Sequence, residues 1–255
     1  MAKIFYYDSA GISDAIITAG TFSSPTFTVS SSAVTNEHKI NDQSIAEAVS
    51  SFHDEDMIRI SFSSAVDVRH ILKYNTVADT NDLWWYMSNH ATNITGTDGT
   101  SGLFQFDSDT PAGWDLISSN EIKSKQYWFI RSEDGLFQGL AEVIMGVKLD
   151  FEVEPDIGIS TSEQFGTITN TSLGGIEYAY KKHNPKSTWI LNFKNISKTF
   201  RDNLANMEQN VTNFKKFVYY DGTNYNYVKL GKTLKFTEVA FERYSVSIEL
   251  IEQLS

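Results

Sequence analysis

Short apolar or alternating runs, separated by clusters of Ser, Thr, Asn, Asp and Gly, recur along most of this chain. A period of two is typical of strands with one buried face, and the polar clusters are typical of turns. The pattern therefore predicts a mainly β protein. The predicted strands are Lys3–Tyr7, Met57–Phe62, Tyr127–Arg131, Ala141–Val147, Trp189–Phe193, Lys216–Tyr220, Tyr225–Leu230 and Tyr244–Leu250.

A helical period appears in the segment Ser197–Val211. Its apolar residues are spaced by four, three and four positions, which places them on one stripe of a helix that should face a core. These residues are Phe200, Leu204, Met207 and Val211. Ser197 is a suitable N-cap for this helix. A shorter stretch, Asp42–Ser50, fits one turn of helix and a loop equally well.

The C-terminal segment predicts a hairpin and a final strand. The sequence VYYDGTNYNYVKL contains two strand-like runs around Asp221-Gly222, a dipeptide that favours a tight turn. In Arg243–Leu254, apolar and polar residues alternate, as expected for a half-buried antiparallel strand.

Charge divides the chain near Asp150–Gly158. Residues 1–150 contain 9 Lys and Arg against 20 Asp and Glu, a net charge of −11, whereas residues 151–255 contain 12 of each. Pro155 and Gly158 suit a linker, so two domains are predicted, residues 1–150 and 151–255. The acidic first part repels phosphate backbones, which argues against nucleic acid as a partner. Neither a signal peptide nor a membrane span is expected, because no long apolar run occurs.

Aromatic residues make up 13% of the chain and provide its most distinctive binding chemistry. Trp84, Trp85 and Tyr86 are consecutive, so in a strand Trp85 must point to the opposite face from the other two. One face is expected to be core, and the other is either covered by a loop or a neighbouring subunit, or binds a ligand. Exposed Trp and Tyr rings can stack on sugar rings, and Trp114 in the loop-like DTPAGWDL is a second such platform. The residues expected in the core are Trp128 and Trp189.

Motifs for catalysis are not evident. The chain has no cysteine, which excludes disulfides, thiolate metal sites and cysteine nucleophiles. None of the five histidines lies in a nucleophile-elbow or metalloprotease motif. Gly231-Lys232-Thr233 lacks the first glycine of a phosphate-binding loop and is interpreted as a hairpin turn.

Acidic clusters are the remaining candidates for a metal site. None has the spacing of a known calcium loop, so they are interpreted as solvated turn residues. They are Asp54-Glu55-Asp56, Asp79 with Asp82, and Asp107 with Asp109. No metal and no cofactor is therefore expected.

Three segments within residues 38–147 share a recognisable order of turns and strands. They are KINDQSIAEAVSSFHDEDMIRISFSSAVDVRHILKY, LWWYMSN and YWFIRSEDGLFQGLAEVIMG. This order resembles the discoidin-type, galactose-binding-like jelly-roll sandwich over about half of the chain, although the family's terminal cysteine pair is absent. The resemblance implies a binding module, often for glycans, whose ligand site lies in loops at one end of the sandwich.

The C-terminal part carries a second pattern. Trp189–Ser197 is followed by the predicted helix, then FVYYDGTNYNYVKL, then LKFTEVAFERYSVSIELIEQL. This order resembles C-terminal regions of tail and baseplate proteins of tailed bacteriophages, including distal-tail and tail-tube domains. The resemblance implies assembly into rings, which requires one patch to meet a different patch on the next copy. The expected interface residues are Phe200, Tyr220, Tyr225, Tyr227 and Tyr244.

The two resemblances lead to one hypothesis and two alternatives. The expected fold is an N-terminal jelly-roll sandwich plus a C-terminal antiparallel sandwich or barrel with one flanking helix. The hypothesis is a non-enzymatic tail or baseplate component of a phage virion, made in the host cytoplasm. Its copies would form a homo-oligomeric ring, and the ring would bind other tail and baseplate proteins. The N-terminal domain would either contact host-surface saccharide, through Trp84, Trp85 and Trp114, or act only as a spacer for fibres. The alternatives are a free carbohydrate-binding or adhesion protein and a glycan-acting enzyme that uses an acidic pair.

Overall fold

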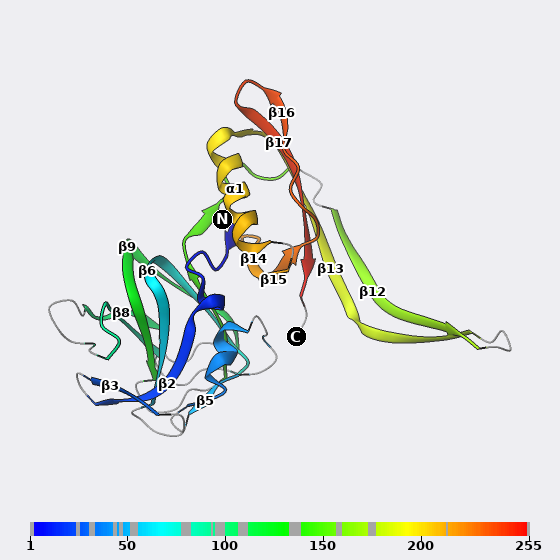
Figure 1. Ribbon diagram of the computed structural model, residues 1–255. Helices are drawn as coiled ribbons and strands as arrows, with labels where there is room; N and C mark the ends of the chain where they lie inside the picture. Colours follow the sequence, from blue (N-terminus) through cyan, green and yellow to red (C-terminus); the bar gives the residue numbers. More distant parts are fainter. Residues whose placement is uncertain are drawn as a thin grey trace. The chain divides into compact units, whose positions relative to one another are not determined.

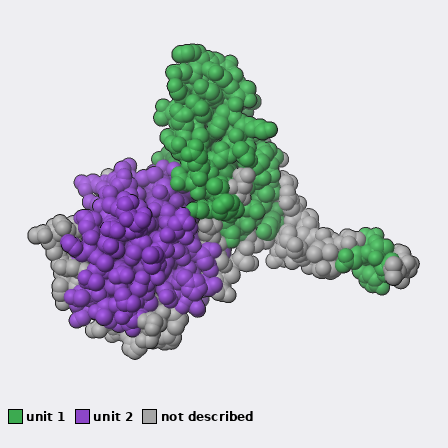
Figure 2. All heavy atoms as spheres, in the orientation of Figure 1, with its two compact units in different colours: residues 1–5, 149–254 green, residues 6–148, 255 purple. Residues whose placement is uncertain are grey.

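The computed structural model divides the chain into two compact units (Figure 2). The inserted unit is Tyr6–Lys148, and the C-terminal unit combines residues 149–254 with residues 1–5. The first strand, β1 (Ile4–Tyr6), pairs in the sheet of the C-terminal unit, whereas the sequence placed it in the first domain. The structure describes residues 3–23, 26–30, 34–42, 45, 48–51, 56–77, 83–92, 94, 100–106, 112–132, 139–156, 160–172, 177–212 and 214–253.

The inserted unit is built on an antiparallel sheet in the order β3-β2-β6-β9-β7-β8, with β10 paired to the second half of β6 (Figure 1). Its strands are β2 (Ile16–Ser23), β3 (Thr26–Val29), β6 (Asp56–Asn75), β7 (Leu83–Ser88), β8 (Thr100–Phe106), β9 (Gly113–Ser132) and β10 (Leu140–Gly146). The unit also contains the 3₁₀ turns η1 (Ile12–Asp14) and η2 (Glu37–Asn41) and the short strands β4 (Val34–Thr35) and β5 (Ser50–Ser51).

This sheet folds over an apolar core. β6 pairs with β9 along most of its length, but the register is interrupted at two places between Ser61 and His70. Ile60, before the interruptions, and Ile71, after them, belong to the same buried cluster. The two halves of β6 and β9 therefore lie in two layers that enclose this core. Trp128 is fully buried within it, as the sequence predicted.

The C-terminal unit contains a second antiparallel sheet, in the order β11-β1-β14-β15-β17-β13-β12, with β16 also paired to β17. Its strands besides β1 are β11 (Lys148–Asp150), β12 (Ser160–Thr171), β13 (Glu177–Ser197), β14 (Phe217–Tyr220), β15 (Tyr225–Leu230), β16 (Thr237–Ala240) and β17 (Arg243–Glu252). Phe5 of β1 packs edge-on against Phe151 and Phe217, with ring centroids 4.7 and 5.4 Å apart. Aromatic contacts therefore join the first strand to residues from the second half of the chain.

The helix α1 (Lys198–Val211) confirms the predicted helix and its cap. The Oγ of Ser197 accepts a hydrogen bond from the backbone N of Phe200 at 3.1 Å. The predicted apolar stripe is buried from Phe200 to Val211. Because this stripe faces the core, α1 is held mainly by packing and only in part by its cap.

The hairpin of β14 and β15 is also as predicted. The Oδ1 of Asp221 accepts hydrogen bonds from the backbone N of Thr223 and Asn224, both at 2.8 Å, and Gly222 supplies a φ of 101°. Burial acts to raise the pKa of Asp221, but these hydrogen bonds and one from the Asn226 amide outweigh it. The pKa of this carboxyl is therefore held below its usual value.

The final strand β17 confirms the predicted alternation, because Val246, Ile248 and Leu250 are buried. The interpretation of Gly231-Lys232 as a hairpin turn is wrong. β15 and β16 both pair with β17 and not with each other. The backbone N of Gly231 donates to the Glu249 carbonyl at 2.8 Å, so this dipeptide begins a connection that stays on β17.

β12 and β13 extend beyond the sheet as a bent, two-stranded ribbon (Figure 1). β13 pairs with β17 only from Thr188 onward, whereas its pairing with β12 continues back to Glu177. We call residues 160–187 the ribbon. Register irregularities beside Gly166 are bulges of the kind that bend a strand. A ribbon of two strands is only marginally stable alone in water, so contact with another surface would stabilise it.

The predicted fold class, mainly β with one helix in the C-terminal unit, is confirmed. The sequence left Asp42–Ser50 open between a turn of helix and a loop. Its described residues are not helical. Within the described ranges, no helix combines the length and the apolar character needed to cross a bilayer.

Candidate functional site

Half-buried aromatic rings gather on the outer face of the inserted unit's sheet. We call Trp84, Tyr86, Phe22 and Arg131 the aromatic cluster. Arg131 on β9 is the direct partner of Trp84 on β7, and its guanidinium carbon lies 5.3 Å from the centroid of the Phe22 ring. The rings of Phe22 and Tyr86 stack with centroids 6.4 Å apart. All four side chains are half-buried, so the cluster is partly accessible.

The β2–β3 hairpin brings Phe22 onto this face. Phe22 is the direct partner of Phe27, and Gly20 is the residue two positions before it on β2. A Cβ atom at position 20 would overlap the Phe27 ring and the Thr28 carbonyl, so glycine allows this close approach. The backbone N of Phe27 donates to the Thr92 carbonyl at 2.9 Å, which fixes the hairpin against the loop that follows β7.

A small apolar core supports the cluster from below. Its buried members are Phe27, Met57, Ile94 and Phe129. The guanidinium carbon of Arg59 lies 4.9 Å from the Phe27 ring centroid, and its terminal nitrogens donate to the Ala91 carbonyl at 2.9 Å and to Thr18 Oγ1 at 3.5 Å. Burial lowers the pKa of Arg59, and the nearby Tyr127 acts in the opposite direction. Arg59 therefore stabilises the β2–β3 hairpin and fixes the loop that follows β7.

The structure separates the three predicted saccharide residues. Trp84 lies in the aromatic cluster. Trp85 is fully buried in the core, so it cannot contact a ligand at the surface, and it is removed from the candidate site. Trp114 lies in strand β9 and not in a loop, where it packs edge-on against Tyr74 with centroids 5.1 Å apart. It stands at the opposite end of β9 from Arg131, so it does not share a site with Trp84.

Two of the five predicted assembly residues are buried, and the other three are half-buried. Phe200 and Tyr227 are buried within the C-terminal unit, which rules them out as exposed interface residues. Tyr220 and Tyr225 are half-buried and contact each other across the hairpin, with centroids 4.7 Å apart. Tyr244 is half-buried below Arg201, whose guanidinium carbon lies 4.7 Å from the ring centroid. Their rings therefore stabilise the unit itself.

Different apolar residues are exposed on the C-terminal unit. Phe241, in the turn between β16 and β17, is 88% exposed, and Val239 on β16 is 55% exposed. Tyr178, near the end of the ribbon, is 58% exposed. Sequence reasoning missed these positions because a single apolar residue in a strand does not indicate whether its face is covered.

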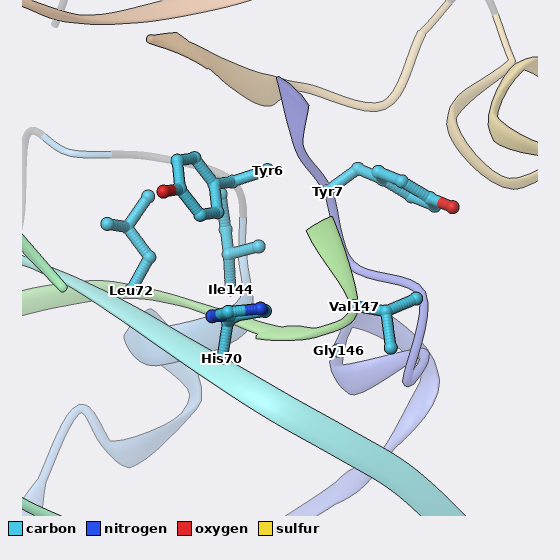
Figure 3. A pocket seen from close by; sticks show the side chains of 7 residues that line it. All are labelled: Tyr6, Tyr7, His70, Leu72, Ile144, Gly146 and Val147. Atoms are coloured by element: carbon cyan, nitrogen blue, oxygen red, sulfur yellow. The ribbon is translucent and has the colours of Figure 1, made fainter. Parts of the chain in front are cut away.

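His70 lines a small cavity in the inserted unit (Figure 3). Its volume is about 10 Å³, which is room for about one water molecule. His70 Nδ1 lies 2.7 Å from Ser118 Oγ, its direct partner across β6 and β9. A space this small admits no saccharide, and the His70–Ser118 pair is a contact across the two strands. The lining residues are Tyr6, Tyr7, His70, Leu72, Ile144, Gly146 and Val147.

A larger groove of about 430 Å³ lies on the C-terminal unit. Lys194 and Asp156 form an ion pair of 2.6 Å beside it, and serine and threonine hydroxyls make up much of the remaining lining. Phe193 is the one aromatic residue among the lining residues, and it is buried. The groove therefore lacks an exposed ring for a sugar to stack on.

Metal binding finds no support in the described part of the chain, where no three His, Asp or Glu side chains are grouped as ligands. Asp56 is described at the start of β6 and is buried. The other predicted acidic candidates, Asp54, Glu55, Asp79, Asp82, Asp107 and Asp109, lie outside the described residues.

Comparisons with known proteins give the chain no family. No family model and no curated protein matches it. Among solved structures, it is similar to chitosan-binding module 1 of a chitosanase/glucanase from Paenibacillus sp. IK-5, with 14% identity and a TM-score of 0.36 over 55% of this chain and 99% of that one. It is also similar to the family 32 carbohydrate-binding module of C. perfringens NanJ in complex with galactose, with 12% identity and a TM-score of 0.35 over 56% and 98%. Both TM-scores are below 0.5, so the function proposed below rests on the geometry of the aromatic cluster.

Proposed function

We propose that this protein is a non-catalytic saccharide-binding protein and that the aromatic cluster of the inserted unit is its binding surface. The observation that carries the proposal is the pairing of half-buried Trp84 with Arg131, beside Tyr86 on the same face. Aromatic rings offer an apolar surface to the C–H face of a sugar, and a guanidinium offers several donors to its hydroxyls. Rigid strands hold both groups, so little ordering is required on binding.

The test is a glycan array probed with the full chain, followed by calorimetry on the best ligand. Trp84→Ala is expected to weaken binding about tenfold or more, which corresponds to about 1.4 kcal/mol. Trp114→Ala is the matched control, because it also removes a half-buried tryptophan ring, but from the end of β9 that is far from Arg131. Equal losses in both variants, or no glycan bound by the folded wild-type protein, would overturn the proposal.

A second function, as a ring-forming structural component of a phage tail or baseplate, is favoured by the ribbon. Two strands that leave the sheet without a further neighbour among the described residues present open edges, and such edges pair readily with another chain. Exposed Tyr178, Val239 and Phe241 would supply apolar contacts. Many copies in a ring would strengthen weak saccharide binding by avidity, so the two functions are compatible.

Solution mass and negatively stained images of the full chain test this second function. A closed ring, lost when residues 166–183 are replaced by an Asn-Gly turn, would support it. A monomer at all concentrations, alone and with candidate neighbouring tail proteins, would contradict it and leave a free carbohydrate-binding protein.

A further inference from the structure

The charge of the aromatic cluster points to a particular class of sugar. Resting on the proposed function, we infer that the preferred ligand is a saccharide that carries a carboxylate, which Arg131 binds through its guanidinium. Among its described residues, the outer face holds two arginines, Arg59 and Arg131, and no Asp or Glu. The face consists of the residues in register with Phe22, Arg59 and Arg131 on the paired strands β2, β3, β6, β7 and β9.

This composition stands out because acids outnumber bases by 20 to 9 in residues 1–150. Two lysines of the inserted unit have carboxylate partners, Lys39 with Asp42 at 3.2 Å and Lys123 with Glu121 at 2.8 Å. Arg131 has no ion pair within the described part of the chain, and its Nε is buried without a hydrogen-bond partner there. A half-buried positive charge without a counter-charge is costly, and an anionic ligand would remove that cost.

The two arginines differ in what they can still bind. Arg59 directs its terminal nitrogens to the Ala91 carbonyl and Thr18 Oγ1. Arg131 contacts the Phe22 ring through its guanidinium, and its terminal nitrogens make no hydrogen bond within the described part of the chain, so they can bind a ligand. A planar guanidinium matches a carboxylate through two parallel, charge-assisted hydrogen bonds. A hexuronic acid stacked on Trp84 would therefore place its carboxylate toward Arg131.

The acidic surroundings do not prevent this contact. At 0.15 M salt the Debye length is about 8 Å, so distant acidic groups are largely screened, whereas a contact ion pair is screened much less. Screening also predicts that lowering the salt concentration slows association of the anionic ligand, because the net repulsion then reaches further.

The experiment compares two matched probes at 0.15 M salt, a tetrasaccharide that contains glucuronic acid and its methyl ester. The wild-type protein is expected to bind the acid at least tenfold more tightly than the ester. Arg131→Gln is expected to bind the acid about as weakly as wild type binds the ester, and Arg131→Lys should recover only part of the difference. The comparison of acid and ester on the wild-type protein tests the preference for a carboxylate even if a variant fails to fold.

The outcomes separate the two proposals. Equal affinity of the wild-type protein for acid and ester would overturn the carboxylate inference and leave saccharide binding intact. Binding of neither probe, with no neutral glycan bound on the array, would overturn the proposed function itself. Preference for the acid that survives in Arg131→Gln would overturn the role of Arg131.

Discussion

Trp84 of β7 and Arg131 of β9 are direct partners across two hydrogen-bonded strands, and both side chains rise from the same face of the sheet. Residues paired in this way have Cβ atoms about 4.5–5.5 Å apart, so the ring and the guanidinium are held together by the backbone. The discoidin-type resemblance implied a ligand site in loops, whereas this candidate site stands on strands. A strand-based site is preorganised and should change little when a ligand binds.

Gly20→Ala is expected to destabilise the inserted unit by about 1–3 kcal/mol, the usual cost of overpacking. The added methyl group would meet the Phe27 ring and the Thr28 carbonyl, so the β2–β3 hairpin must shift away from the sheet. Urea unfolding measures the loss, and Thr28→Ala on the exposed side of β3 is the control. A Gly20→Ala protein of wild-type stability would show that the hairpin is not packed as described.

Ser197→Ala should cost about 1 kcal/mol of unfolding free energy, because it removes the hydrogen bond to Phe200 N at the start of α1. Ser197→Thr should recover most of the loss. Ser197→Asp should not recover the loss, although Asp is ordinarily as good an N-cap as Ser. The Ser197 hydroxyl also donates to Glu152 Oε2, and a carboxylate at position 197 would repel the Glu152 carboxylate. Thermal denaturation of the three variants checks this order. Full rescue by Asp would mean that the contact with Glu152 is unimportant.

The pH dependence of stability should include a contribution from Asp221. Its pKa is lowered in the folded protein, so its stabilising effect is fully present above the unfolded-state value of about 3.9 and is lost as the pH falls through the folded value. Urea unfolding at pH 7 and pH 3 should therefore show a smaller loss for Asp221→Asn than for the wild-type protein. An identical loss in both would contradict the assignment.

Phe241 and Phe200 should respond to substitution in opposite ways. Phe200→Ala is expected to cost about 3–5 kcal/mol, because the side chain is buried below α1. Phe241→Ser should leave stability within about 0.5 kcal/mol, because the ring is exposed, and it should reduce self-association if the β16–β17 turn lies in an interface. Denaturation and solution mass, measured on both variants, separate the two effects. Reduced self-association in stable Phe200→Ala alone would favour the original interface assignment.

Local patterns in the sequence predicted what depends on local geometry. The alternation of Trp84, Trp85 and Tyr86 placed Trp85 on the opposite face from the other two rings, but it did not identify which face is core, so the buried Trp85 was included among the saccharide contacts. The spacing from Phe200 to Val211 predicted the buried stripe of α1. The strand that carries Arg131 was also predicted, but its partner was not. Pairing between β7 and β9 joins residues far apart in the chain, and a single sequence contains no signal for that register.

The ribbon contains a strand that the sequence pattern could not predict. The segment STSEQFGTITNT of β12 has little apolar alternation, so it was not predicted as a strand. Its strand conformation follows from its pairing with β13, from Ser160–Ile190 to Thr171–Glu177. Likewise, Tyr227 was assigned to an interface because it is aromatic, whereas its place in β15 turns it inward.

The chain crosses between the two units at Phe5–Tyr6 and again at Lys148–Leu149, and this has a consequence for biosynthesis. β1 is synthesised before the inserted unit, yet the ring partners of Phe5 in β14 are synthesised after it. The inserted unit can fold as soon as its own residues have emerged, since domains generally fold as units during synthesis. The sheet of the C-terminal unit cannot close until β14, β15 and β17 have been synthesised. A chain cut after Lys148 would therefore contain the whole inserted unit, preceded by a β1 strand without its partners.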